Sequence, residues 1–165
     1  MFREVNFPAD VPGRLLLHSM PGRWEPLQSF LAEGDHANLT GIVRLTDLAE
    51  LRQKSPEYAD ALQEGRIPCE VLACEMPDYG VPGDRRAFWA LARDVAGHLK
   101  DGQVWLVHCG AGIGRTGAFA AAVLIALGQP VELARLAVSK AGSGSETDDQ
   151  LDLIAWCAVQ ADKGR

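Results

Sequence analysis

The stretch VWLVHCGAGIGRTGAFAAAVLIAL, residues 104–127, places a short apolar run, a glycine-rich turn and a long alanine-rich run in direct succession. The apolar run Val104–Val107 predicts a short buried strand. The glycine-rich loop Cys109–Gly114 follows it. The segment Arg115–Leu127 predicts a helix that is apolar on most faces and therefore lies in the middle of the domain, with Gly128 as its stop. The rest of the chain is expected to pack around this strand–loop–helix unit.

The segments on either side of this unit alternate between strand-like and helix-like patterns. Further strands are expected at Leu15–Leu17, Gly41–Leu45 and Pro68–Cys74. Helices are expected at Trp24–Glu33, Thr46–Lys54, Pro56–Gln63 and Arg85–Lys100, then from Pro130 onward, and at Glu146–Ala161. This alternation predicts an α/β fold in one domain, residues 1–165, with a central mostly parallel or mixed sheet of about four to five strands and helices on both faces.

Composition and charge exclude several classes of function. The chain has 165 residues, of which 47% are hydrophobic and 23% charged, as in an ordinary folded domain. A formal net charge of −6 argues against nucleic-acid or anionic-membrane binding through a basic surface. The start, Met1–His18, lacks the pattern of a signal peptide, and the apolar run Ala118–Leu127 is too short to cross a membrane. We expect a soluble, cytoplasmic protein with no nucleic-acid and no membrane partner, of unknown oligomeric state.

The cysteines and histidines show no metal-ligand spacing. The sequence contains neither a C-x-x-C pair nor an H-x-x-x-H pair, so no metal and no other cofactor is expected. Cys69, Cys74 and Cys157 are expected to pack in the core. The alternative is a reversible disulfide that protects Cys109 from oxidation.

The loop Cys109–Gly114, here named the phosphate loop, combines a thiol with features of an anion-binding site. Its glycines allow backbone N–H groups to turn inward, and the following helix contributes its positive N-terminus. Cys109 lies in that field and is expected to be ionised at neutral pH, while Arg115 can hold two oxygens of a phosphate at once. Cys109 is therefore the expected nucleophile. The residues expected to bind the phosphate are Gly110, Ala111, Gly112, Ile113, Gly114 and Arg115.

Other interpretations fit parts of this loop. Gly112, Gly114 and Gly117 match a dinucleotide-binding fingerprint, which also needs an acidic residue at the end of a second strand about 20 positions on. Glu132 has that distance but begins a helix. A nucleotide-binding P-loop would need a lysine that is missing here. A structural cysteine is the common case, but the adjacent glycines and arginine argue against it.

The run His108-Cys109, five residues, Arg115-Thr116 resembles the H-C-x5-R-[S/T] signature of the protein tyrosine phosphatase superfamily at every fixed position. The resemblance implies the fold of that superfamily and two-step hydrolysis of a phosphate monoester through a phosphocysteine intermediate. It also implies that His108 orders the loop and helps to hold the thiol ionised. Thr116 would donate a hydrogen bond to the sulfur as the thiolate leaves in the second step.

The segment Met76–Pro82, here named the acid loop, resembles the mobile loop that carries the general acid in this superfamily, with Met76 in place of the usual tryptophan. Asp78 is the expected acid in the first step and the base in the second. Pro-Asp-x-Gly also fits an ordinary turn, and Asp84 is the reserve candidate. The segment Ser145–Gln150 resembles the glutamine loop of the tyrosine-specific branch, in which Gln150 would position the attacking water, although the same residues fit a helix-capping box.

The expected substrate is a phosphorylated protein or peptide, with phosphotyrosine preferred. The variable loop positions Gly110, Ala111 and Ile113 carry no charge, whereas phosphoinositide members of the superfamily often place lysines there. Trp24 could set the depth of the pocket, but we expect it to be buried.

Three alternatives remain. The compact size of the chain fits dual specificity, which would include phosphoserine and phosphothreonine. Hydrolysis of inositol phosphates or RNA 5′-phosphates would need positive charge at the pocket, for which Arg85 and Arg86 are the candidates. A non-catalytic phosphate-binding module would typically lack the cysteine, the arginine or the acid, and all three are present.

Overall fold

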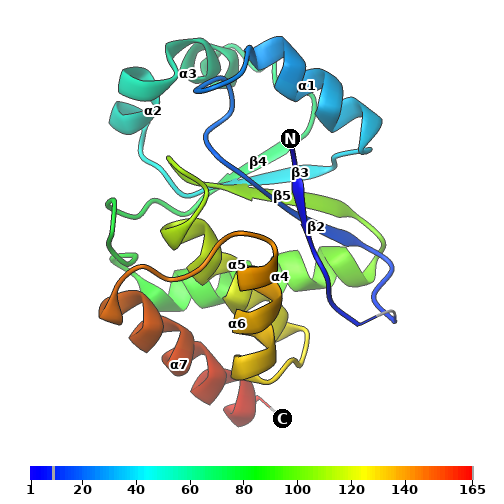
Figure 1. The fold of residues 1–165 in the computed structure, drawn as a ribbon, viewed down its shortest axis with the longest axis vertical. Helices are drawn as coiled ribbons and strands as arrows, with labels where there is room; N and C mark the ends of the chain where they lie inside the picture. Colours follow the sequence, from blue (N-terminus) through cyan, green and yellow to red (C-terminus); the bar gives the residue numbers. More distant parts are fainter. Residues whose placement is uncertain (9, 165) are drawn as a thin grey trace.

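A five-stranded sheet forms the middle layer of the computed structural model, which describes residues 1–8 and 10–164 (Figure 1). In order across the sheet, the strands are β1 (Arg3–Val5), β2 (Arg14–His18), β5 (Val104–His108), β3 (Gly41–Arg44) and β4 (Glu70–Ala73). Neighbours from β2 to β4 are parallel, and β1 runs antiparallel to β2. The predicted mixed α/β sheet is confirmed.

The register of the central strands determines where the phosphate loop begins. His108, the last residue of β5, is paired with His18 at the end of β2 and with Arg44 at the end of β3. Because β2, β3, β4 and β5 run in one direction, the loops that follow them meet at one edge of the sheet. Cys109 therefore emerges in the middle of this edge, where ligands of open α/β sheets bind.

Helices cover both faces of the sheet (Figure 1). One face carries α1 (Leu27–His36), α2 (Leu48–Lys54) and α3 (Pro56–Gln63), and the other carries α4 (Arg85–Lys100), α5 (Gly114–Ala126), α6 (Val131–Lys140) and α7 (Asp148–Lys163). Helix α5 is buried along nearly its whole length and packs against α4, α6 and α7, as its all-round apolar sequence predicted. Within the described residues, no helix is long and apolar enough to span a membrane.

Strand β5 separates two hydrophobic cores. Trp105 and Val107 face the larger core, which lies under α4–α7, whereas Val104 and Leu106 face the smaller core under α1–α3. Side chains of successive strand residues point to opposite faces, so a strand of continuous apolar residues fills both cores at once. This double burial fixes the position of the phosphate loop that follows.

Two features of the N-terminal region differ from the sequence-based prediction. Strand β1 has three residues, of which Arg3 and Glu4 are polar, so it lacks the apolar alternation that predicts a strand. Helix α1 begins at Leu27 rather than at Trp24, because Pro26 precedes it with a non-helical ψ of 138°. Trp24 thus lies outside the helix, is 63% exposed and has the Arg23 guanidinium 4.1 Å above its ring, so the expected burial of Trp24 is wrong.

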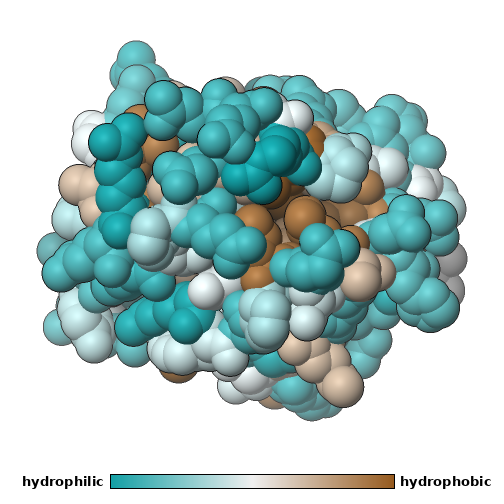
Figure 2. Space-filling model, turned by 90° about the horizontal axis from the view of Figure 1, so that it is seen from above, coloured by the Kyte–Doolittle hydropathy of each residue, from teal (hydrophilic) through white to brown (hydrophobic). Residues whose placement is uncertain are grey.

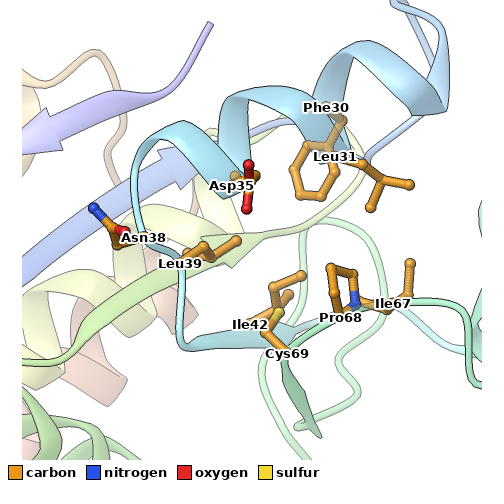
Figure 3. Close-up of a pocket in the computed structure, with 10 residues that line it drawn as sticks. Phe30, Leu31, Asp35, Asn38, Leu39, Ile42, Ile67, Pro68 and Cys69 are labelled. Carbon is orange, nitrogen blue, oxygen red and sulfur yellow. The ribbon is translucent and has the colours of Figure 1, made fainter.

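The layer of α1–α3 leaves an apolar hollow over the sheet. Figure 2 looks down on this layer and shows hydrophobic residues gathered in the hollow. Phe30 and Leu31 of α1 line a cavity of about 120 Å³ together with Ile42 of β3 and Ile67 before β4 (Figure 3). The cavity lies at the amino ends of β3 and β4, the opposite end of the strands from Cys109.

Gly97 offers a test of helix stability in α4. It is exposed, and a Cβ atom there would have no neighbour within 4 Å. Gly97→Ala should raise the free energy of unfolding by about 0.5–1 kcal/mol, because alanine loses less backbone entropy on folding. Urea titration measures this. Gly65→Ala is the control: its Cβ also has open space, but its φ of +66° is strained for alanine, so it should destabilise. A Gly97→Ala variant no more stable than the parent would contradict the prediction.

Candidate active site

The phosphate loop holds the Cys109 sulfur among backbone amides. Cys109 is 3% exposed, and the N–H of Gly112 donates a hydrogen bond to its Sγ over 3.2 Å. Gly112 has a φ of +75°, and a Cβ on it would lie 2.4 Å from the carbonyl oxygen of His18. A side chain at Gly112 would therefore force the loop away from the end of β2. The sulfur is buried, but an amide of its own loop faces it.

Surrounding groups bind the carbonyl groups of this loop from outside. The oxygens of His108, directly before the loop, and of residues 109, 110, 112 and 113 within it all accept hydrogen bonds, at 2.6–3.2 Å. The Leu45 N–H donates to the His108 oxygen, the His108 ring to the Cys109 oxygen and the Met20 N–H to the Gly110 oxygen. Arg3 and Ser143 both donate to the Gly112 oxygen, and the N–H groups of Gly117 and Gly144 both donate to the Ile113 oxygen. In a planar trans peptide the N–H points opposite to the carbonyl. The N–H groups of residues 109–111, 113 and 114 thus point away from these outside donors, which is the orientation that an anion cradle requires.

Glu50 of α2 holds the Arg115 guanidinium in a two-point ion pair. Glu50 Oε2 lies 2.7 Å from Arg115 Nη1, and Oε1 lies 2.9 Å from Nη2. Lys54, one turn further along α2, contacts Oε1 at 2.7 Å. The hydrogen bond from Arg115 is the main cause that lowers the pKa of Glu50 from 4.5 to about 2. Arg115 is 2% exposed, so this pair fixes its fork before any ligand arrives.

The acid loop lies over the same guanidinium. Asp78 Oδ1 is 3.1 Å from Arg115 Nη2, and the carbonyl of Met76 accepts from Nη1 over 3.1 Å. Met76 is buried in the larger core, so methionine fills the place of the usual tryptophan. Asp84, the reserve acid, instead caps α4 by accepting from the N–H groups of Arg86 and Ala87. The structure thus brings Asp78, and not Asp84, to Arg115.

His108 is fully buried and its protonation follows from its two neighbours. Its Nδ1 lies 3.2 Å from the Cys109 carbonyl oxygen, and its Nε2 lies 3.0 Å from the Tyr58 hydroxyl. A carbonyl can only accept, so Nδ1 carries the proton and Nε2 accepts from Tyr58. Burial lowers the pKa of His108 to about 3, so the ring is neutral at pH 7. The neutral ring links the phosphate loop to Tyr58 of α3.

Gln150 joins the acid loop to the start of α7. It is fully buried; its Nε2 donates to the Gly80 carbonyl over 3.1 Å, and its Oε1 accepts from the Glu146 N–H over 2.8 Å. The Thr147 hydroxyl oxygen also accepts a hydrogen bond from the backbone N–H of Gln150, as the capping interpretation predicted. Both ends of the Gln150 amide are therefore engaged by protein. The role of Gln150 toward water stays a prediction.

Thr116 is fully buried on the first turn of α5. Its hydroxyl oxygen has no hydrogen-bond partner in residues 1–8 and 10–164. The predicted bond from Thr116 to the sulfur is therefore not formed in this arrangement, where Gly112 is the donor to Sγ. A buried hydroxyl without a partner is costly, which favours a partner during turnover. Its role in the second step remains a prediction.

The remaining cysteines are free thiols that pack as predicted. Cys157 is buried in the larger core, and Cys69 and Cys74 are half-buried against the two cores. Burial raises the pKa of Cys69 and of Cys74 to about 11, and that of Cys157 to about 12. These thiols are thus protonated at neutral pH. Across the described residues, no three His, Cys, Asp or Glu side chains gather as metal ligands.

Sequence analysis missed three residues of this site: Glu50, Tyr58 and Arg3. Glu50 and Lys54 look like an ordinary surface pair four positions apart on a helix. The usable signal was Arg115 itself, since a buried guanidinium needs a carboxylate partner. Helix α2 follows β3, so its first turn lies at the edge where Arg115 was expected. Neither Tyr58 nor Arg3 lies in a motif, and no sequence signal pointed to them.

The Glu50–Arg115 pair predicts a pH-dependent stability. The folded-state pKa of Glu50 lies below its ordinary value, so the carboxylate stabilises the fold at neutral pH, and this contribution is lost as the pH falls from about 4.5 to about 2. Glu50→Gln should lower the melting temperature at pH 7, and its difference from the parent should shrink toward pH 2. The control, Glu132→Gln at the exposed start of α6, should change stability far less, because its ion pair with Arg135 is exposed to solvent. A difference that stays constant with pH would refute this assignment.

Comparisons with known proteins bear on the family and the fold of this chain. A family model described as "Polymorphic toxin system, DSP-PTPase phosphatase" matches residues 18–129. Kinase associated phosphatase, with its catalytic cysteine replaced by serine, superposes with a TM-score of 0.78 at 19% identity, covering 99% of this chain and 94% of that one. Tk-PTP in its active form superposes with a TM-score of 0.71 at 24% identity, covering 91% of this chain and 95% of that one. PTPMT1 in complex with PI(5)P superposes with a TM-score of 0.73 at 22% identity, covering 91% of this chain and 93% of that one. At these identities the structures show a common fold.

Proposed function

The chain belongs to the DSP-PTPase phosphatase family, and from this premise we propose that it hydrolyses phosphate monoesters, preferably phosphotyrosine in proteins or peptides, with Cys109 as the nucleophile. One observation carries the proposal: outside donors bind the loop carbonyls while the Gly112 N–H faces the Cys109 sulfur, and the Arg115 guanidinium lies against Gly110 of the same loop. Such a site binds a tetrahedral oxyanion and presents a nucleophile to its phosphorus.

The first step forms the phosphocysteine. The Cys109 thiolate attacks phosphorus, the P–S bond forms, and the P–O bond to the leaving group breaks. Asp78 donates its proton to the leaving oxygen, so the leaving group departs as a neutral alcohol or phenol. A thiolate of this kind works in a reducing compartment, so we place the activity in the cytoplasm.

The second step returns the enzyme to its starting state. Water attacks phosphorus, Asp78 takes a proton from that water, and the P–S bond breaks to release inorganic phosphate and the Cys109 thiolate. In this step Thr116 supplies a hydrogen bond to the departing sulfur. Gln150 orients the water once its amide leaves the Gly80 carbonyl.

The hydrogen bonds of Arg115 support a coupled role for Asp78. Nη1 and Nη2 carry four N–H groups, and the structure engages them with Glu50 twice, with Met76 and with Asp78. A phosphate oxygen that binds Nη2 in place of a carboxylate therefore displaces Asp78. This leaves the Asp78 carboxyl beside the leaving oxygen, where the acid is needed.

The charges near the pocket support a substrate with a single phosphate. Lys54 lies near the loop, since a Cβ on Gly110 would be 3.2 Å from its Nζ, but Glu50 pairs with it. Arg85 stacks on Trp156 at 4.7 Å and so does not extend freely toward the pocket. A substrate with several phosphates would need unpaired cations at these places.

The rim of the site supports an aromatic ester. Trp24 (63% exposed), Tyr79 (62%) and Ile113 (41%) lie in the loops after β2, β4 and β5, and Leu48 (51%) is the first residue of α2, directly after the loop that follows β3. These four exposed apolar residues therefore lie at the edge of the sheet where Cys109 emerges. A phenyl phosphate fits an apolar rim better than a short serine phosphate does.

A substrate panel tests the proposal. Peptides with phosphotyrosine, phosphoserine or phosphothreonine, inositol phosphates, an RNA 5′-phosphate and PI(5)P in detergent micelles are compared by kcat/KM, with Cys109→Ser as the blank. Phosphotyrosine should exceed each of the others by roughly 10-fold or more, the discrimination that a pocket of apolar contacts supplies. Equal rates on phosphoserine would establish dual specificity, and faster hydrolysis of PI(5)P or RNA would overturn the protein-substrate assignment. No hydrolysis above the blank would overturn the enzymatic proposal itself.

A further inference from the structure

Arg3 connects the edge strand β1 to the phosphate loop. Its Nη2 donates to the Gly112 carbonyl over 2.7 Å, and its Nη1 donates to the Ala141 carbonyl and to Ser143 Oγ, both at 3.0 Å. Ser143 Oγ itself donates to the Gly112 carbonyl over 2.6 Å. One guanidinium thus joins the N-terminal strand, the loop after α6 and the phosphate loop.

The peptide bond after Gly112 is the part of the cradle that these contacts orient. Two donors on the Gly112 carbonyl hold that peptide plane, and the Ile113 N–H at its other end points away from Arg3. On the opposite side, Gly112 rests on the backbone of His18 and Ser19 at the end of β2, with no room for a side chain. The loop is therefore clamped between β2 and Arg3 at the residue that donates to the sulfur.

The charge of Arg3 also acts at this point. Burial lowers the pKa of Arg3, and the attraction of an ionised Cys109 opposes this lowering. Arg115, whose guanidinium is paired with Glu50 and Asp78, also interacts with the charge of Cys109. Arg3 is thus a second cation whose charge interacts with Cys109, and the oxygens to which it donates are neutral.

We propose that Arg3 is a positioning residue of the phosphatase site, which holds the Gly112 carbonyl outward so that the loop amides are preorganised for the phosphate oxyanion. The inference rests on the proposed function, since it concerns the same loop. Arg3 acts through Gly112 and does not touch the phosphate.

The test measures the loop without any turnover. Iodoacetamide alkylation of Cys109 is followed by peptide mass, as a function of pH and with inorganic phosphate as a protecting ligand. The variants are Arg3→Met, Arg3→Lys and Ser143→Ala. The control is Arg14→Met, which removes a surface arginine that pairs with Glu4 on the neighbouring strand. Circular dichroism and melting temperature show whether each variant is folded.

The expected results separate the charge of Arg3 from its geometry. Arg3→Met should weaken protection by phosphate roughly 10- to 100-fold, the usual cost of a misplaced site group, and should move the alkylation profile to higher pH. Arg3→Lys should keep the profile of the parent and lose protection, because one ammonium cannot reproduce the fork. Ser143→Ala should weaken protection less than Arg3→Met, and Arg14→Met should behave as the parent.

Unchanged protection in a folded Arg3→Met variant overturns the inference. If Arg3→Met does not fold, the Ser143→Ala variant provides the test instead. Full protection by phosphate in Ser143→Ala also overturns the inference. Failure of the proposed function has a different signature: the parent would hydrolyse no substrate of the panel, while the protection assay would still report on Arg3.

Discussion

Cys109→Ser is expected to abolish turnover, by on the order of 10⁴-fold or more, while the protein still binds phosphate esters. The serine hydroxyl is far less acidic than a thiol, so the amide field beside it does not produce a nucleophile at neutral pH. The cradle does not depend on the sulfur, because residues outside the loop hold its carbonyls and Glu50 holds Arg115. The loss should therefore fall on kcat and spare binding.

Two measurements check this expectation. Phosphate release from a phosphotyrosine peptide gives kcat, and calorimetric titration of the same peptide into Cys109→Ser gives its affinity. Cys74→Ser is the matched control, because Cys74 is a half-buried thiol whose pKa is raised to about 11, and this variant should keep full activity. Two results would contradict the assignment of Cys109 as the nucleophile. One is a kcat of Cys109→Ser equal to that of the parent, and the other is a loss of kcat in Cys74→Ser as large as that in Cys109→Ser.

Asp78→Asn is expected to slow the first step by roughly 10²–10⁴-fold, the range of a general acid. Asparagine can still contact Arg115 Nη2 through its amide oxygen, so the acid loop should keep its closed position while the proton is lost. The effect should be large for an alkyl phosphate, whose leaving oxygen needs the proton. It should be small for p-nitrophenyl phosphate, whose leaving group departs as the anion.

The pH profile and a second aspartate provide the check. The parent should show a bell-shaped dependence of kcat/KM on pH, and Asp78→Asn should lose the limb that reports the acid. Asp84→Asn keeps a side chain that can cap α4 and should retain parental activity. If Asp78→Asn hydrolyses alkyl phosphates at full rate while Asp84→Asn does not, the acid is Asp84.

The fold and the centre of the site could be predicted because their signals are local. The apolar run 104–107, the glycines and the alanine-rich helix each predict their own conformation, and the run is long enough to place Cys109 at a strand end. The α3 and α4 boundaries match the prediction, since Pro56 opens one and Asp84 caps the other. Where a proline or a cap residue is present, the start of the helix can be predicted from the sequence.

The supporting contacts could not be predicted because they join residues far apart in the chain. Arg3 lies 109 positions from Gly112, and Glu50 lies 65 positions from Arg115. Such pairs depend on the strand order, in which β1 joins the edge beside β2 and β3 pairs with β5. A motif indicates that a loop needs outward carbonyls, but the donors come from whichever elements the topology places around it.

The buried amide of Gln150 has a consequence for how substrates enter. To swing aside, the acid loop must give up the bond from Gln150 to the Gly80 carbonyl and leave a carboxamide unsatisfied in the interior until solvent reaches it. Gln150 thus acts as a latch that holds the acid loop in place over Arg115 until the loop opens.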